Sequence, residues 1–135
     1  MQALDTNILV RFLVKDDEKQ ADAVFSLIKK AERRREKLFV SLIVLLELIW
    51  VLDSLYKVPR DKLLYAISTL LMLPILEIED RDIVYSFLHE AKNNTYDLDD
   101  LLIACKARAR GCNQVITFDK KAAQHNLFRL VETSP

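Results

Sequence analysis

Carboxylates stand in this sequence at points where a strand would end or a helix begin. Asp5 follows a short apolar run in LDTN, and Asp119 ends the segment ITFD. Glu47 interrupts the apolar run LIVLLELIWVL. Three more acids stand together in YDLDDLLIA: Asp97, Asp99 and Asp100. Carboxylates transfer protons or bind hard metal ions, so the chemistry depends on which of them the fold brings together.

Glu47 is the most unusual of these acids. The residues three and four places away on a helix are all apolar: Ile43, Val44, Trp50 and Val51. An ionised carboxylate buried without a partner is costly. Glu47 must therefore reach solvent, pair with a cation, stay protonated or bind a metal. A solvent-facing polar stripe shared with Ser54 is the alternative to a metal-binding role.

The elements that would position these acids alternate along the chain. Periodicity and turn residues predict short strands at 3–6, 38–42, 75–79, 114–118 and 128–132. Longer helical patterns occupy 7–14, 17–36, 43–56, 59–72, 80–93 and 98–110, with a short helix at 119–125. Ser41 is the expected cap of the apolar helix, and Gly111 the expected stop of the helix at 98–110. The alternation predicts an α/β fold, a three-layer α/β/α sandwich around a mostly parallel five-stranded sheet.

Length and charge fit one globular domain. The 135 residues, 51% of them hydrophobic, predict a single domain over 1–135 with a real core. With 20 basic and 20 acidic residues the chain is neutral, so nucleic-acid binding would need a local patch. The charge run KKAERRREK, residues 29–37, favours a solvated helix end, with a nucleic-acid patch as the alternative.

Nothing in the sequence predicts secretion or a membrane span. The opening MQALDTNILVRFLV carries Asp5 and Arg11 inside its apolar stretch and lacks a basic leader. The run 42–52 is too short to cross a bilayer. Cys105 and Cys112 lie seven apart in one expected helix, a separation of about 10 Å that is too long for a disulfide. We therefore expect reduced thiols in a cytoplasmic protein.

The predicted sheet would gather the acids. Parallel strands end at one edge, where functional sites of such sheets lie. Taken singly, Asp119 and at least two of the acids at 97–100 are best explained as helix caps. Asp5 could cap a helix too, but it ends a strand that we expect to be central and buried. Taken together, converging carboxylates repel one another unless a hard divalent cation such as Mg²⁺ or Mn²⁺ neutralises them. Zinc fits poorly because His89 and His125 have no ligand spacing with the cysteines. One or two Mg²⁺ ions suit phosphodiester chemistry.

Four segments, in order, resemble a known family. They are LDTNILVRFLVKDD, VSLIVLLELIWVL, YDLDDLLIACKARARGC and VITFDKKAA. The chain resembles the PIN-domain family over nearly its whole length, and closely the VapC-type toxin ribonucleases of toxin–antitoxin pairs.

By position, the resemblance implies a set of four catalytic, metal-binding acids: Asp5, Glu47, Asp100 and Asp119. Asp100 is preferred to Asp99 because it directly precedes LLIA, as the family's acid precedes its L-I-A. The resemblance also implies three supporting polar residues: Asn7, Asp97 and Thr117.

The same resemblance implies an activity and partners. It predicts a Mg²⁺- or Mn²⁺-dependent endoribonuclease, with one or two ions, in which a metal-activated water attacks RNA. It further implies a cognate antitoxin protein and a homodimer. Cations near the site acids in sequence are candidate RNA contacts: Arg11, Lys106, Lys120 and Lys121.

Two alternatives differ in function. A receiver-like Mg²⁺-binding signalling domain would normally have paired acids after its first strand and a lysine after its last. Here Asp5 stands alone and the closing FRLVETSP has no lysine. A catalytically inactive PIN-fold binding protein is the second alternative, and the complete set of four acids argues against it.

Overall fold

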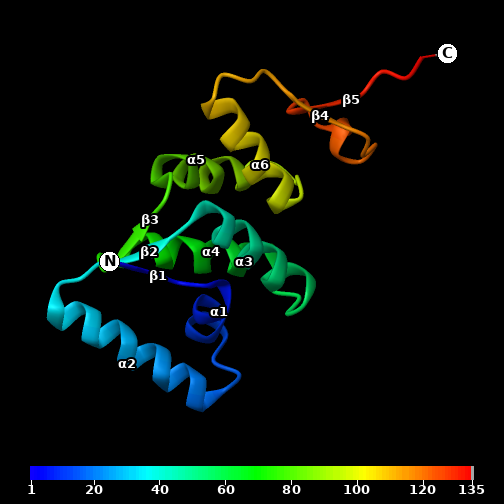
Figure 1. The fold of residues 1–135 in the computed structure, drawn as a ribbon. Helices are drawn as coiled ribbons and strands as arrows, with labels where there is room; N and C mark the ends of the chain where they lie inside the picture. The colour runs from blue at the N-terminus through cyan, green and yellow to red at the C-terminus, as the bar shows by residue number, and fades with distance from the viewer. Residues whose placement is uncertain (135) are drawn as a thin grey trace. The chain divides into compact units, whose positions relative to one another are not determined.

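A three-stranded parallel sheet organises the first part of the chain (Figure 1). Its strands β1 (Gln2–Ala3), β2 (Leu38–Val40) and β3 (Leu76–Ile78) lie in the order β1-β2-β3. The structure, a computed structural model, describes residues 1–134. The chain divides into two compact units, Met1–Arg81 and Asp82–Pro135. Pro135 itself lies outside the described residues.

Four helices complete the first unit. They are α1 (Thr6–Val14), α2 (Glu18–Arg34), α3 (Leu42–Ser54) and α4 (Arg60–Leu71). Helix α1 packs against α2 and α3, and α3 packs against α4. Helix α3 buries one apolar side: Leu45, Leu48, Ile49 and Leu52. This burial fixes α3 in the core of the first unit.

Two oxygens hold the start of α3. The Ser41 hydroxyl accepts a hydrogen bond from the Val44 amide at 3.1 Å, which confirms Ser41 as the cap. The Glu79 carboxylate, just after β3, accepts one from the Leu42 amide at 2.8 Å. The first amides of a helix have no intrahelical partner, so both bonds fix where α3 begins. The position of Glu47, one turn further on, depends on them.

The second unit contains two helices and a two-stranded parallel sheet. Helix α5 (Arg81–Ala91) begins at the last residue of the first unit and leads to α6 (Leu98–Ala109). Strands β4 (Val115–Thr117) and β5 (Phe128–Leu130) pair in parallel, and the 3₁₀ turn η1 (Ala122–Gln124) connects them. Ala104, Ala122 and Phe128 form their small apolar core.

One cysteine of the second unit is buried and belongs to a polar cluster with a half-buried carboxylate and an exposed arginine. The Cys105 thiol donates to Glu90 Oε2 at 3.2 Å, and Arg108 donates to both oxygens of the same carboxylate. Burial, then the hydrogen bond to Glu90, raises the pKa of Cys105 to about 12. Both cysteines are free, as expected. The expectation that one helix carries both is wrong, since α6 ends at Ala109 and Cys112 is exposed beyond it.

The predicted elements recur in type and order, with two local differences. Thr6 begins α1 instead of ending the first strand, because the Asp5 carboxylate caps that helix. The helix expected at 119–125 is a single 3₁₀ turn. Gly111, at φ 91°, follows the end of α6 as expected, because a residue with a Cβ rarely adopts that conformation.

The α/β class is confirmed, but the five-stranded sheet is not. The described strands fall into one sheet of three and one of two, all parallel. The single domain stays a prediction. Within residues 1–134, every helix is too short or too polar to cross a membrane.

Replacing Ser41 by alanine should destabilise the protein. The Ser41→Ala change removes the acceptor of the Val44 amide, a loss of about 1 kcal/mol in the free energy of unfolding. Urea denaturation measures it. Ser26→Ala is the matched control, because Ser26 is exposed inside α2, where alanine is the better helix former. Equal stability of Ser41→Ala and wild type would contradict the capping role.

The two thiols should react at very different rates. At pH 8 a thiol with a pKa of about 12 is ionised to roughly one part in 10,000, and Cys105 is also buried. With a chromogenic disulfide reagent, one fast equivalent is expected, from Cys112. Cys112→Ser should abolish the fast phase and Cys105→Ser should keep it. The reverse pattern would refute the assignment.

Candidate active site

Asp5 caps α1 and lies exposed beyond the end of β1. Its Oδ1 accepts a hydrogen bond from the Thr6 amide at 2.8 Å. We expected the end of the first strand to be buried; Leu4 and Thr6 are, but Asp5 is not. Its second oxygen, Oδ2, accepts no hydrogen bond from residues 1–134. The capping explanation is therefore confirmed for one oxygen, while the other is left for a ligand.

Glu47 is exposed on α3. Within the described chain its carboxylate forms no ion pair or hydrogen bond and reaches solvent, where it is accessible to a metal ion. The surrounding stripe is apolar, however, because Ile43 is 79% and Trp50 51% exposed. Ser54, one turn beyond Trp50, is half-buried and therefore less exposed than Ile43 and Trp50. Glu47 thus presents a charge within an exposed apolar strip.

Arg11 is held inside the first unit. Its Nη1 donates to Asp16 Oδ1 at 2.6 Å and to Tyr56 Oη at 3.1 Å, and the Tyr56 hydroxyl donates to Asp16 Oδ2 at 3.0 Å. Its Nε donates to Gln20 at 2.5 Å. These bonds tie α1 and the start of α2 to the chain after α3. Asn7 is exposed in the first turn of α1.

The acids of the second unit lie close enough to perturb one another. Asp100 is half-buried, and burial raises its pKa above the usual range. The negative charges of Asp99, Asp97 and Asp119 raise it further, while Lys121 lowers it. The Asp100 carboxylate accepts no hydrogen bond from the described residues, whereas Asp99 Oδ1 accepts one from the Asp100 amide at 2.9 Å. Asp100 is thus an uncompensated carboxylate at the start of α6.

Asp119 is positioned by the chain around it. Its amide donates to Thr117 Oγ1 at 3.0 Å, and its Oδ1 accepts from the amides of Lys121 at 2.9 Å and Ala122 at 3.3 Å. Its Oδ2 has no donor within residues 1–134. As with Asp5, capping engages one oxygen of the carboxylate.

The cations of the second unit differ in their surroundings. Lys121 Nζ lies 3.4 Å from Asp97 Oδ1 in an exposed ion pair. Lys106 is exposed on α6, and Lys120 is exposed beside Asp119. Lys121 therefore balances part of the local negative charge.

Two polar residues escaped the sequence analysis. Glu79 follows β3 as Asp5 follows β1, and it caps α3. The signal for it was the acid directly after the alternating run ILEI. Thr6 is buried, and its hydroxyl has no hydrogen-bond partner among the residues described. No sequence pattern marks a threonine of this kind.

The predicted acids divide between the two units. Asp5 and Glu47 belong to the first unit, and the other four to the second: Asp97, Asp99, Asp100 and Asp119. In the part of the chain that is described, neither unit by itself brings three carboxylate, imidazole or thiol groups within reach of one ion. The predicted donors are all oxygens, the ligands of a hard divalent cation.

Comparison with known proteins identifies the family. A model of the PIN domain matches residues 3–126. The chain belongs to the PIN domain family. This PIN domain is also similar to the VapC ribonuclease of Aquifex aeolicus (strain VF5), with 26% identity over 121 residues, 90% of this chain and 89% of that one. The resemblance seen in the sequence is confirmed, and the receiver-like alternative is set aside.

Removing the Asp100 charge should stabilise this PIN domain when no metal is bound. A raised pKa means that the ionised carboxylate is less favourable in the folded chain than in the unfolded one. This cost is absent at acidic pH and present once the pH has risen above the folded pKa. Asp100→Asn should therefore increase stability at pH 7 in EDTA, by less than about 1 kcal/mol because the site is partly exposed.

Thermal unfolding in EDTA at pH 7 and at pH 4 measures this effect. Asp22→Asn, an exposed acid on α2, is the matched control and should change little. A lower melting temperature for Asp100→Asn than for wild type at pH 7 would show that the charge is compensated.

Proposed function

We propose that this PIN domain is a divalent-metal-dependent endoribonuclease, the toxin of a VapBC-type toxin–antitoxin pair. The observation that carries the proposal is the similarity to a VapC ribonuclease over nine-tenths of both chains. That relative is named a ribonuclease, and the four predicted acids lie within residues 3–126, which the PIN domain model matches. The uncompensated carboxylates give the chemical support.

The proposed metal ligands are Asp5, Glu47, Asp100 and Asp119, holding one or two Mg²⁺ or Mn²⁺ ions. Three features, taken over both units, fit a hard cation: unengaged oxygens on Asp5 and Asp119, an unpaired Glu47, and the raised pKa of Asp100. When bound, such an ion lowers the pKa of an attacking water and neutralises the phosphate.

The chain's own residues position those oxygens. The Thr117 hydroxyl and the amides of Lys121 and Ala122 hold Asp119 in one orientation. The Thr6 amide does the same for Asp5. In this proposal Asn7 and Asp97 are supporting polar groups that orient waters or carboxylates. The proposal also requires the two parallel sheets to form the one five-stranded layer that the sequence predicts.

Cations must attract RNA to a site so rich in carboxylates. Arg11, Lys106, Lys120 and Lys121 stay the proposed contacts near the acids. Arg11 and Lys121 already pair with Asp16 and Asp97, so an RNA phosphate must compete for them. Lys120 is exposed directly beside Asp119, which makes it the stronger candidate.

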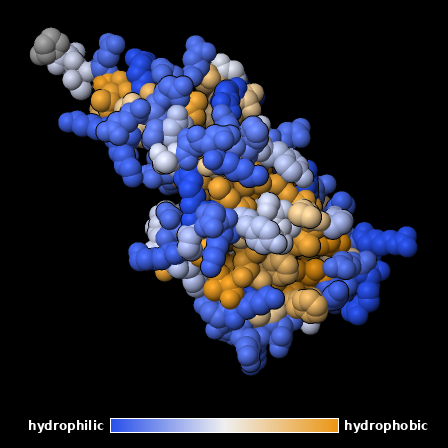
Figure 2. All heavy atoms as spheres, turned by 180° about the vertical axis from the view of Figure 1, so that it is seen from behind, coloured by the Kyte–Doolittle hydropathy of each residue, from blue (hydrophilic) through white to orange (hydrophobic). Residues whose placement is uncertain are grey.

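Protein partners would use apolar surface. The first unit exposes large apolar side chains on α3, on α4 and just after them: Ile43, Trp50, Leu55, Tyr65 and Met72. Figure 2 shows hydrophobic surface among hydrophilic residues on the face that it draws. Exposed apolar surface of this kind supports contacts with an antitoxin and with a second copy of the chain. The two free thiols support a cytoplasmic location.

Loss of one acid should abolish cleavage. Asp5→Asn and Asp100→Asn should each slow Mg²⁺- or Mn²⁺-dependent cleavage of total RNA by about 100-fold or more, because each removes a proposed ligand. The control variant Asp22→Asn should cleave RNA at the wild-type rate. Gel analysis with mapping of the RNA ends measures the rate and the products.

Three results would refute the proposal. They are cleavage by wild type in EDTA, 2′,3′-cyclic phosphate ends, and full cleavage by metal-saturated Asp5→Asn. A wild-type protein that cleaves no RNA with either metal would instead favour the inactive, binding-only alternative.

A further inference from the structure

The most concentrated positive charge in the chain lies where α2 meets β2. Residues 29–37, here called the cationic segment, contain six cations and two carboxylates. Every side chain in it except Ala31 is exposed. Within residues 1–134 none of its cations forms an ion pair, and Lys29 only approaches the Phe25 ring, at 5.2 Å.

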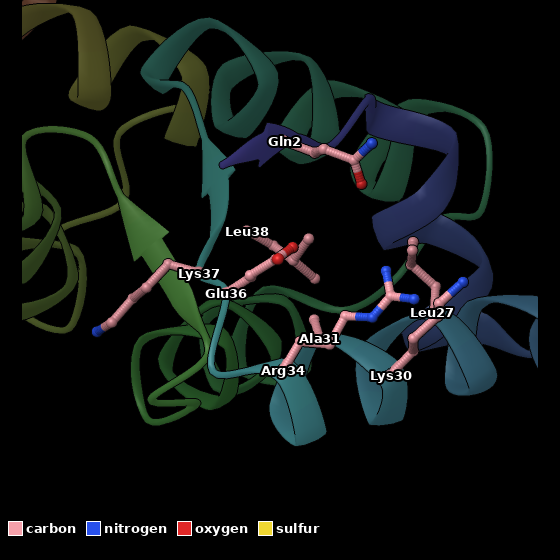
Figure 3. Close-up of a pocket in the computed structure, with 8 residues that line it drawn as sticks. All are labelled: Gln2, Leu27, Lys30, Ala31, Arg34, Glu36, Lys37 and Leu38. Carbon is pink, nitrogen blue, oxygen red and sulfur yellow. The ribbon is translucent and has the colours of Figure 1, made fainter.

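Two hollows flank the cationic segment within the first unit. One, of about 170 Å³, lies between α2 and the amino ends of β1 and β2. Figure 3 shows Lys30 and Arg34 extending from α2 toward it, with the Gln2 amide facing it from β1. Lys37 points away from these two cations. It also lines the second hollow, of about 360 Å³, together with Arg35. Cations are therefore presented to both hollows.

Helix stability alone does not account for this charge. The helix dipole favours cations in the last turn, which covers Arg33 and Arg34. Lys29 and Lys30 lie four residues before them, a spacing at which like charges repel along a helix. Lys37 lies beyond the helix altogether. A bound polyanion would remove this repulsion by neutralising several cations at once.

RNA is the polyanion that the chemistry of this chain requires. The whole chain is neutral, so it has no general attraction for phosphate, and the proposed active-site acids repel RNA. Affinity must then come from a local group of Lys and Arg that displaces counterions from the phosphates.

We propose that the cationic segment of the first unit binds the sugar-phosphate backbone of RNA at a site separate from Asp5, with Lys30, Arg34 and Lys37 as phosphate contacts. This inference rests on the proposed function, because it concerns the same RNA. Gln2 and Asp5 stand at the amino and carboxyl ends of β1, about 10 Å apart along the chain. A very short oligonucleotide reaches only one of the two places, whereas a longer or folded RNA reaches both.

Binding without cleavage tests the proposal. The probe is a fluorescein-labelled 30-nucleotide RNA hairpin, titrated in EDTA and followed by anisotropy over a range of KCl concentrations. The triple variant Lys30→Gln, Arg34→Gln, Lys37→Gln should bind about tenfold more weakly or worse. The slope of log K against log salt should fall by about 2, since each lost phosphate contact removes roughly 0.7–0.9.

A matched variant separates local from bulk charge. Lys19→Gln, Lys62→Gln, Lys92→Gln removes the same total charge from three exposed lysines outside the cationic segment, at the start of α2, on α4 and just after α5. It should bind within about twofold of wild type. Glu36→Gln removes the one carboxylate of the smaller hollow and should tighten binding about twofold or more. Circular dichroism checks that each variant is folded.

Three results would overturn the inference. Unchanged binding by the cationic-segment variant, or equal weakening by both triple variants, would show that the segment is ordinary surface. Equal affinity for poly-glutamate, lost by the same substitutions, would indicate an acidic protein as the partner. RNA cleavage by wild type is measured separately. If the protein binds RNA through this segment but does not cleave it, the inference holds and the proposed function fails. If it cleaves RNA but does not bind it through this segment, the proposed function holds and the inference fails.

Discussion

The candidate site of this PIN domain depends most on how its carboxylates are balanced. Asp100 shows the constraint directly: it is half-buried, it lies among Asp97, Asp99 and Asp119, and burial and repulsion raise its pKa. Lys121 offsets only part of that charge, through an exposed pair with Asp97. Without a metal, keeping such a group ionised costs the folded chain stability. A divalent cation turns the same repulsion into favourable binding.

Capping and ligation turn out to be compatible roles for one carboxylate. From the sequence, Asp5 and Asp119 were either helix caps or metal ligands. In the structure the Oδ1 atom of each accepts hydrogen bonds from backbone amides. Within the described chain the Oδ2 atom of each accepts no hydrogen bond. A carboxylate has two oxygens, and a bond that fixes one of them also orients the other. In the proposed metal site, the cap would thus orient the second oxygen toward the ion.

Local signals in the sequence predicted the elements well because their causes are local. The hydroxyl of Ser41, the positive φ of Gly111 and the alternation around Glu77 each act within a few residues. The features that the sequence could not predict depend on contacts between residues far apart in the chain. The Glu79 cap joins residues 37 apart, and the buried hydroxyl of Thr6 follows from packing alone. The pairing of strands into two sheets is likewise a property of contacts far apart in the chain.

The candidate site shows the same division. The residue types and their order identified the acids and the family, since both are written in the sequence. Their exposure was not predictable: Asp5 was expected to be buried and is exposed, and the apolar neighbours Ile43 and Trp50 are exposed together with Glu47. Along the sequence, this neutral chain gathers six cations in residues 29–37, apart from the predicted acids. This separation is what an enzyme acting on a polyanion needs, because the acids that hold a metal cannot also attract the substrate.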